Sequence, residues 1–180
     1  MPNMYLVCGI SGSGKTYFSK QLEEKLNIER ISVDDIYRQL NGDELIRTNK
    51  FEVWISLFQE IHRLEIAEKD VIIDTNALKH SHRVQFVDWF PSYNHHLIFV
   101  SADHDLRMRN IENRLRKIDE STIQYMESIV EVPTKELDKE WDTITYINNS
   151  HNVFQKPIFE KDRLDVFWQN IVFFIPYRQN

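Results

Sequence analysis

Three of the four glycines in this 180-residue chain lie within one stretch of eight residues, GISGSGKT, at positions 9–16. The stretch matches G-x-x-x-x-G-K-[ST], a loop whose backbone N–H groups turn inward around phosphate oxygens because glycine tolerates the angles required. Its lysine adds a point charge to the β- and γ-phosphates, and its last hydroxyl can ligate Mg²⁺. The residues predicted to bind a nucleoside triphosphate are Gly9, Ser11, Gly12, Ser13, Gly14, Lys15 and Thr16.

A carboxylate ends the apolar run VIID, at Asp74. An aspartate in this position is expected near the magnesium ion, so Asp74 and Thr16 are the predicted metal ligands. ATP-driven motors generally follow this aspartate with a glutamate that activates water, whereas Thr75 and Asn76 follow it here. The pattern therefore favours transfer of phosphate to a bound acceptor over hydrolysis.

Two adjacent aspartates occupy the stretch ISVDDIYRQL, at the end of another apolar run. A carboxylate there would lie beside the phosphate loop, where it can orient an acceptor hydroxyl and take its proton. Arg38, one helical turn on, could grip a phosphate that the acceptor already carries. Asp34 or Asp35 could instead cap the helix that begins here. We expect at least one of the two to be catalytic.

Five basic residues lie within eleven positions of the stretch DLRMRNIENRLRKIDE. On a small mobile lid, at about residues 105–130, they would neutralise charge on the transferring phosphoryl group and exclude water. The alternative is a solvated helix with surface ion pairs. We favour the lid because the run follows a predicted strand of a phosphate-loop fold. Its basic residues are Arg107, Arg109, Arg114, Arg116 and Lys117.

Short β-branched runs alternate with longer patterns of helical period along the chain. This alternation predicts right-handed βαβ units, and hence an α/β protein with a mostly parallel sheet covered by helices on both faces. Ligands of such sheets bind beyond the carboxyl ends of the strands, where the residues above are found. Strands are expected at 4–9, 29–33, 70–75, 95–101 and 143–147, helices at 15–26, 51–66, 80–89, 106–117 and 122–130, and an apolar helix or late strand at 164–175.

The composition fits one folded domain spanning residues 1–180, because 42 % of the residues are hydrophobic and 12 % are aromatic. The single cysteine, Cys8, excludes an internal disulfide and fits a reducing compartment, and we expect it to pack in a buried strand. No signal peptide or bilayer-spanning run is evident, so a cytoplasmic protein without a membrane partner is expected. The net charge of −6 argues against broad nucleic-acid binding but allows a local basic groove.

Four segments, taken in order, resemble the polynucleotide 5′-kinase branch of phosphate-loop (P-loop) kinases of phages and RNA-repair enzymes, which are ATP-binding proteins with an AAA-like domain. The resemblance covers roughly residues 4–130. It implies a three-layer fold with a five-stranded parallel sheet of order 2-3-1-4-5 and an arginine-bearing lid. It also implies transfer of the γ-phosphate of ATP to a 5′-hydroxyl of DNA or RNA. The segments are GISGSGKTYFSKQL, SVDDIYRQL, VIIDTNALKHSHR and RNIENRLR.

The resemblance also implies roles for single residues. Lys15 and Thr16 would serve ATP and magnesium, and one aspartate of the adjacent pair would be the general base. Arg38 would contact the phosphate of the acceptor. The segment that matches DTN…R would line the acceptor side through Asp74, Thr75, Asn76 and Arg83, and the lid pair would be Arg109 and Arg114.

Some features depart from the family pattern. The lid pair is five residues apart where the pattern has four, so Arg116 could replace Arg114 at the nucleotide. The segment VPTKELDKEWDTITYI resembles small members of the superfamily that need not act on polynucleotides. The alternative is therefore a kinase for a small acceptor such as a nucleoside, nucleotide, sugar or antibiotic. A nucleotide-binding module without transfer chemistry is a third hypothesis.

Overall fold

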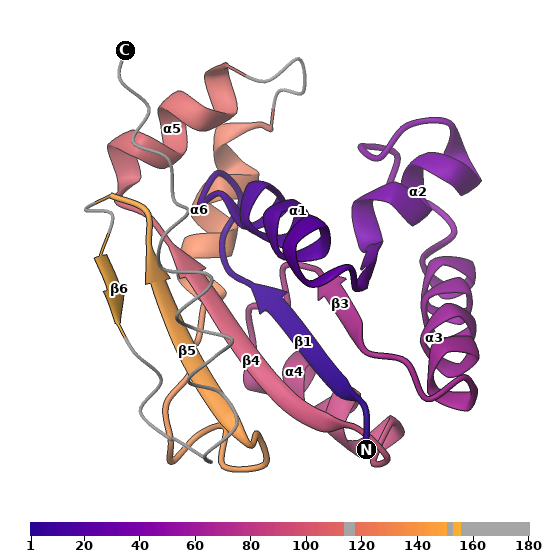
Figure 1. The fold of residues 1–180 in the computed structure, drawn as a ribbon. Coiled ribbons are helices and arrows are strands. Elements are labelled where there is room, and N and C mark those ends of the chain that lie inside the picture. The colour runs from indigo at the N-terminus through magenta and orange to yellow at the C-terminus, as the bar shows by residue number, and fades with distance from the viewer. Residues whose placement is uncertain (114–117, 151–152, 156–180) are drawn as a thin grey trace.

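One mixed sheet forms the centre of the molecule in the computed structural model, which describes residues 1–113, 118–150 and 153–155 (Figure 1). Within these residues the strand order is β2-β3-β1-β4-β5-β6, and every neighbouring pair is parallel except β5 and β6. The predicted order 2-3-1-4-5 is confirmed. The strands are β1 (Asn3–Cys8), β2 (Glu29–Ser32), β3 (Val71–Asp74), β4 (Asn94–Ser101), β5 (Thr143–Asn148) and β6 (Val153–Gln155).

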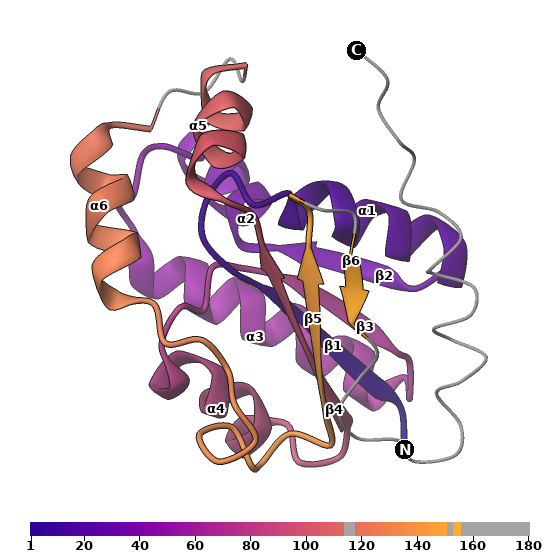
Figure 2. The same ribbon diagram turned by 90° about the vertical axis from the view of Figure 1, so that its left-hand side faces the viewer.

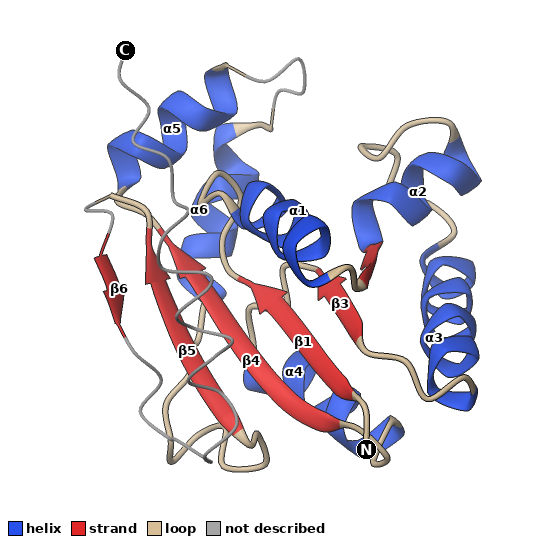
Figure 3. Ribbon diagram, in the orientation of Figure 1, coloured by secondary structure: helices blue, strands red, loops and turns tan. Residues whose placement is uncertain are grey.

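The helices flank this sheet on both faces (Figures 2 and 3). Five of them agree with the expected ranges to within a few residues, except where a predicted helix runs into residues 114–117, which the structure does not describe. For the helix that begins at Val33, the sequence predicted a start near Asp34 and Asp35 but no range. The expected apolar segment 164–175 also lies outside the described residues. The helices are α1 (Lys15–Leu26), α2 (Val33–Asn41), α3 (Lys50–Ile66), α4 (His80–Trp89), α5 (His104–Glu112) and α6 (Glu120–Ile129).

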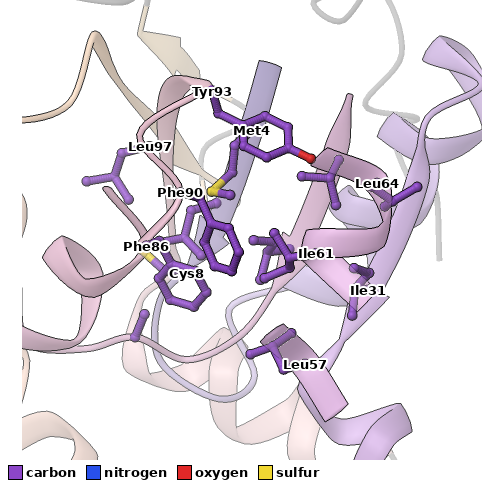
Figure 4. Close-up of a cluster of buried hydrophobic side chains, with 14 of the residues drawn as sticks. Met4, Cys8, Ile31, Leu57, Ile61, Leu64, Phe86, Phe90, Tyr93 and Leu97 are labelled. Atoms are coloured by element: carbon purple, nitrogen blue, oxygen red, sulfur yellow. The ribbon is translucent and has the colours of Figure 1, made fainter. Parts of the chain in front are cut away.

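Strand β1 contributes to both layers of the core because successive side chains of a strand point to opposite faces. Tyr5 and Val7 pack with Phe18 and Leu22 of α1 on one face. On the other face, β1 packs against α3 and α4 in a second cluster (Figure 4). That second cluster includes Met4, Leu6, Cys8, Leu57, Ile61, Leu64, Phe86 and Phe90, each at most 4 % exposed.

Cys8 lies in this apolar layer and is fully buried. Burial raises the pKa of its thiol to about 12, because the interior disfavours the thiolate. The thiol therefore stays protonated at neutral pH and acts as a small apolar side chain, as the sequence indicated.

The helices after β4 begin with aspartate caps. Asp103 accepts from Leu106 N at 2.8 Å at the start of α5, and Asp119 accepts from Thr122 N at 2.8 Å at the start of α6. Each carboxylate satisfies an N–H group that has no partner within the helix. The two helices therefore occupy most of the region predicted as a lid.

No helix among the described residues is long and apolar enough to cross a membrane.

Candidate active site

A pocket opens beyond the carboxyl ends of β1, β2 and β3, where ligands of parallel sheets are expected. Three segments form it: the loop between β1 and α1, the start of α2 with the loop that follows α2, and the end of β3. The lining residues are Ser11, Gly12, Gly14, Lys15, Thr16, Ser32, Val33, Asp34, Arg47, Asp74, Thr75 and Asn76.

The glycines of the loop at 9–16 are required by both backbone angles and space. Gly9 has φ +141°, and a Cβ atom there would lie 2.1 Å from the carbonyl oxygen of Val100. Gly12 has φ +84°, and a Cβ atom would lie 2.6 Å from the carbonyl oxygen of Arg107. The loop is thus pressed against β4 and α5, with no room for a side chain at either position.

Side chains hold the carbonyl oxygens of the same loop. Asn110 of α5 donates from Nδ2 to Gly12 O at 2.7 Å, and Asn149, just after β5, donates to Ser13 O. Lys15 is 8 % exposed, and its Nζ donates to Ile10 O at 3.0 Å. Together with the bond from Ser13 N to Ile10 O at 3.2 Å, these bonds fix the loop in front of the positive end of α1, which suits an anion.

Asp74 is held rigidly at the base of the pocket. It is 4 % exposed, and its Oδ2 accepts from Ser19 Oγ at 3.0 Å and from Arg30 Nη1 at 3.3 Å. Thr16, one turn before Ser19 on α1, lines the same pocket. Both residues offer oxygen atoms, the ligand type that Mg²⁺ prefers, and Mg²⁺ binds through one or two protein ligands together with phosphates and water.

The donor set therefore fits magnesium held jointly with phosphate. Elsewhere in the part of the chain that the structure describes, no group of three or more His, Cys, Asp or Glu side chains is arranged to hold a metal ion. Thr16 and Asp74 would be its ligands here, as the sequence predicts.

The two adjacent aspartates have different surroundings. Asp34 lines the pocket, and its Oδ1 accepts from Arg47 Nη2 at 2.7 Å. Asp35 lies outside the pocket lining, with one oxygen bound to Arg30 at 2.9 Å and the other to Arg38 at 2.6 Å. Of the two, Asp34 is therefore the carboxylate placed to meet a ligand.

Neither aspartate is the N-cap of α2. The N-cap is Ser32, whose Oγ accepts from Asp35 N at 3.4 Å. The sequence-based alternative, in which an aspartate is the cap, is therefore wrong. Both carboxylates instead lie in the first turn, where they face the positive end of the helix.

The family comparison fits this geometry. The model of a family described as AAA domain matches residues 4–133, which hold the phosphate loop, both aspartates and Asp74. The chain belongs to the AAA domain family.

Two relatives of this AAA-domain protein are cytidylate kinases. The one from Archaeoglobus fulgidus is 27 % identical over 114 residues, which cover 60 % of this chain and 59 % of the relative. The one from Sulfurisphaera tokodaii is 33 % identical over 79 residues, which cover 39 % of this chain and 44 % of the relative. The matched part thus spans less than two thirds of either relative.

Solved structures of two kinases and of the protein Kti12 share its fold. A sugar kinase from a Janibacter species is 18 % identical with a TM-score of 0.59, over 82 % of this chain and 86 % of that one. A gluconokinase from Sinorhizobium meliloti is 19 % identical with a TM-score of 0.56, over 82 % and 81 %. Chaetomium thermophilum Kti12 in complex with ADP-AlF3 is 16 % identical with a TM-score of 0.61, over 93 % and 98 %. The AAA-domain protein therefore has the fold of P-loop kinases.

The predicted arginines are not gathered in its pocket. Arg38 has a side chain that is 52 % exposed and bonds to Asp35 at 2.6 Å and Glu44 at 2.9 Å. Arg109 is exposed on α5 and is absent from the pocket lining. Arg107 is 7 % exposed and ties α5 to α6 through Glu127. Arg114 and Arg116 lie outside the described residues.

Several residues at the site of the AAA-domain protein escaped the sequence analysis. Arg47 lines the pocket from the loop between α2 and α3, and Arg30 links Asp74 to Asp35. Asn110 lies within the segment RNIENRLR, whose arginines alone suggest phosphate contacts, and Asn149 lies two residues after a predicted strand. Periodicity carries no information on such contacts, since they join positions far apart in the sequence.

Arg83 does not line the acceptor side as expected. It is fully buried, and its Nε and Nη2 bond to the two carboxylate oxygens of Asp138, both at 2.8 Å. Its Nη1 donates to the carbonyl oxygens of Leu78 at 3.2 Å and Glu131 at 2.9 Å. Every nitrogen of the guanidinium is therefore used inside the protein. Arg83 joins the segment after β3 to the segment after α6.

Arg83→Met is expected to lower the free energy of unfolding by about 3–5 kcal/mol, because the carboxylate of Asp138 stays buried and loses both contacts to the guanidinium, while its 3.1 Å contact to His80 Nδ1 remains. Urea denaturation of both proteins measures this difference. The double variant Arg83→Met/Asp138→Leu removes both charges and should recover much of the loss. A cost below about 1 kcal/mol for the single variant would contradict a structural role for Arg83.

Proposed function

We propose that this protein is an ATP- and Mg²⁺-dependent kinase that transfers the γ-phosphate to a hydroxyl group of a bound acceptor. The observation that carries the proposal is the position of Asp34 in the same pocket as Lys15 and Thr16. A phosphate loop alone binds a nucleotide. A carboxylate that faces the loop from another element adds a group that can take the proton of an acceptor.

In the proposed reaction, the loop N–H groups and Lys15 hold the β- and γ-phosphates. Thr16 and Asp74 would hold Mg²⁺, which would neutralise charge on the phosphates. The acceptor oxygen forms a bond to the γ-phosphorus, the bond from that phosphorus to the bridging oxygen breaks, and ADP leaves with the electron pair. Asp34 accepts the proton of the attacking hydroxyl.

The geometry favours a small molecule as the acceptor of the proposed kinase. The two arginines expected to grip a polynucleotide, Arg38 and Arg83, are absent from the pocket lining and bound to carboxylates. The relatives and structural neighbours are named cytidylate kinase, gluconokinase and sugar kinase, after small molecules. A hydroxyl acceptor agrees better with Asp34 than a phosphate acceptor, which is already ionised and needs no base.

A 5′-hydroxyl end of DNA or RNA is the second candidate. Its support is the segment after β3: Thr75 and Asn76 both line the pocket beside Asp74, in the positions that the polynucleotide kinase pattern gives to acceptor-facing residues. Because the net charge is −6, such a nucleic acid would have to bind in a local groove.

Transfer of label from [γ-³²P]ATP in the presence of Mg²⁺ tests the proposal. The acceptors are a panel of nucleosides, nucleoside monophosphates and sugars, with 5′-hydroxyl DNA and RNA oligonucleotides beside them. We expect label on a small acceptor, and none after chelation of Mg²⁺ with EDTA. An oligonucleotide that outcompetes every small acceptor would establish the second candidate. Release of free phosphate alone, or binding of ATP without any turnover, would contradict a kinase.

A further inference from the structure

Arg47 lies opposite the phosphate loop, in the connection between α2 and α3. Among the pocket-lining residues that the structure describes, Lys15 and Arg47 carry the positive charges. Lys15 belongs to the loop that holds the donor phosphates. Arg47 is on the side of Asp34, where the acceptor is expected to bind.

The guanidinium of Arg47 packs over the ring of a buried tyrosine, Tyr37. Its Cζ lies 4.3 Å from the ring centroid of Tyr37, and Tyr37 is 7 % exposed and packs in the core. A guanidinium stacked on an aromatic ring keeps its plane and its N–H directions, so it presents a fixed fork to an anion.

The bond of Arg47 to Asp34 is one that a ligand can replace. The side chains of Arg47 and Asp34 are 36 % and 40 % exposed, in contrast to the fully buried pair of Arg83 and Asp138. Half-exposed ion pairs of this kind contribute little net stability, because water competes for both charges. A ligand anion with more charge and more acceptor oxygens than a carboxylate can therefore take over the guanidinium.

We propose that Arg47 recognises a phosphate ester carried by the acceptor, and that this phosphate replaces Asp34 as the partner of the guanidinium held over Tyr37. The carboxylate of Asp34, no longer paired with Arg47, can then accept from the neighbouring acceptor hydroxyl. The inference rests on the proposed function, since that function gives Asp34 its role as base. It assigns the acceptor to phosphorylated alcohols that keep a free hydroxyl, such as sugar phosphates and nucleoside 3′-monophosphates.

The two partners of this ion pair should respond in opposite directions. Loss of Arg47 removes the fork that binds the phosphate, so affinity for a phosphorylated acceptor should fall. Neutralising Asp34 removes the carboxylate that competes for the fork, so affinity for the same acceptor should rise. A pair that only anchors the loop would give no such change of sign.

Equilibrium binding to the full chain, loaded with Mg²⁺ and a non-hydrolysable ATP analogue, provides the test. The probes form two pairs, each of an unphosphorylated compound and its phosphorylated form: adenosine with adenosine 3′-monophosphate, and ribose with ribose 5-phosphate. Each probe is titrated into the protein by calorimetry. The wild type should bind the phosphorylated member of a pair about ten- to a hundredfold more tightly, as a charge-assisted bidentate contact allows. Arg47→Ala should abolish this preference, Arg47→Lys should keep part of it, and Asp34→Asn should increase it severalfold.

Arg63→Ala is the matched control, since Arg63 is an arginine of α3 in exposed ion pairs with Glu29 and Glu60, outside the pocket lining. It should leave the preference unchanged. The inference is overturned if the wild type shows no preference for phosphate, if Arg47→Ala keeps the preference, or if Arg38→Ala removes it in place of Arg47→Ala. Binding of the ATP analogue is measured first. Its failure to bind would contradict the proposed function, while the same titrations without it would still decide the role of Arg47.

Discussion

Lys15→Ala is expected to reduce phosphoryl transfer by at least about a hundred- to a thousandfold while the protein remains folded. The lysine is the one basic residue within the loop at 9–16, so its ammonium would face the charge that develops on the β- and γ-phosphates. Removing one preorganised electrostatic contact to a transition state costs roughly this factor. The rate of transfer to the best acceptor of the panel measures the effect.

The same substitution should change stability much less. In the structure, Nζ of Lys15 donates a 3.0 Å hydrogen bond to Ile10 O, and the loss of such a bond costs about 1 kcal/mol. Lys20→Ala on the exposed side of α1 is the control for charge and helix composition, and should keep wild-type transfer. Near wild-type transfer by Lys15→Ala would show that this loop is not the catalytic site.

Most element bounds could be predicted because they depend on local patterns, whereas the strand order 2-3-1-4-5 was implied by the resemblance to polynucleotide kinases. Consecutive apolar residues such as Tyr5 and Leu6 mark a strand that is buried on both faces, and α1 begins directly after the glycine loop. The parallel arrangement then follows from the rule that βαβ connections are right-handed. The short strand β6 pairs antiparallel with β5, and its three residues are too few to give a periodic signal.

The positions of the main site residues could also be predicted from the sequence, but the partners of their side chains could not. Lys15 and Asp34 come after predicted strands, and Asp74 lies near the end of one, so their convergence at the carboxyl edge of the sheet could be expected. The hydrogen-bond and ion-pair partners of individual side chains could not be predicted in this way. Arg83 and Asp138 are 55 positions apart, and nothing in either segment distinguishes an arginine that faces a ligand from one that is buried with a carboxylate.

Asp34→Asn is expected to lower transfer by about a hundred- to ten-thousandfold with little change in ATP affinity. The reason is that Asn cannot accept the proton of the acceptor hydroxyl, and general base catalysis contributes about this factor. The substitution keeps the size of the side chain and an oxygen that can accept from Arg47, so the pocket should keep its shape. Turnover and the dissociation constant of an ATP analogue, measured on the same preparation, separate the two effects.

Asp35→Asn is the comparison that makes this test decisive. Asp35 has the same side chain one position on, but its oxygens bond to Arg30 at 2.9 Å and Arg38 at 2.6 Å, and it lies outside the pocket lining. Its neutralisation should lower transfer less than about tenfold, through the weaker hold of Arg30, which also bonds to Asp74 at 3.3 Å. Equal and mild effects of both substitutions, or a larger effect at Asp35, would contradict Asp34 as the base. A large effect at Asp34 alone would place the proton acceptor on the pocket side of α2, between the phosphate loop and Arg47.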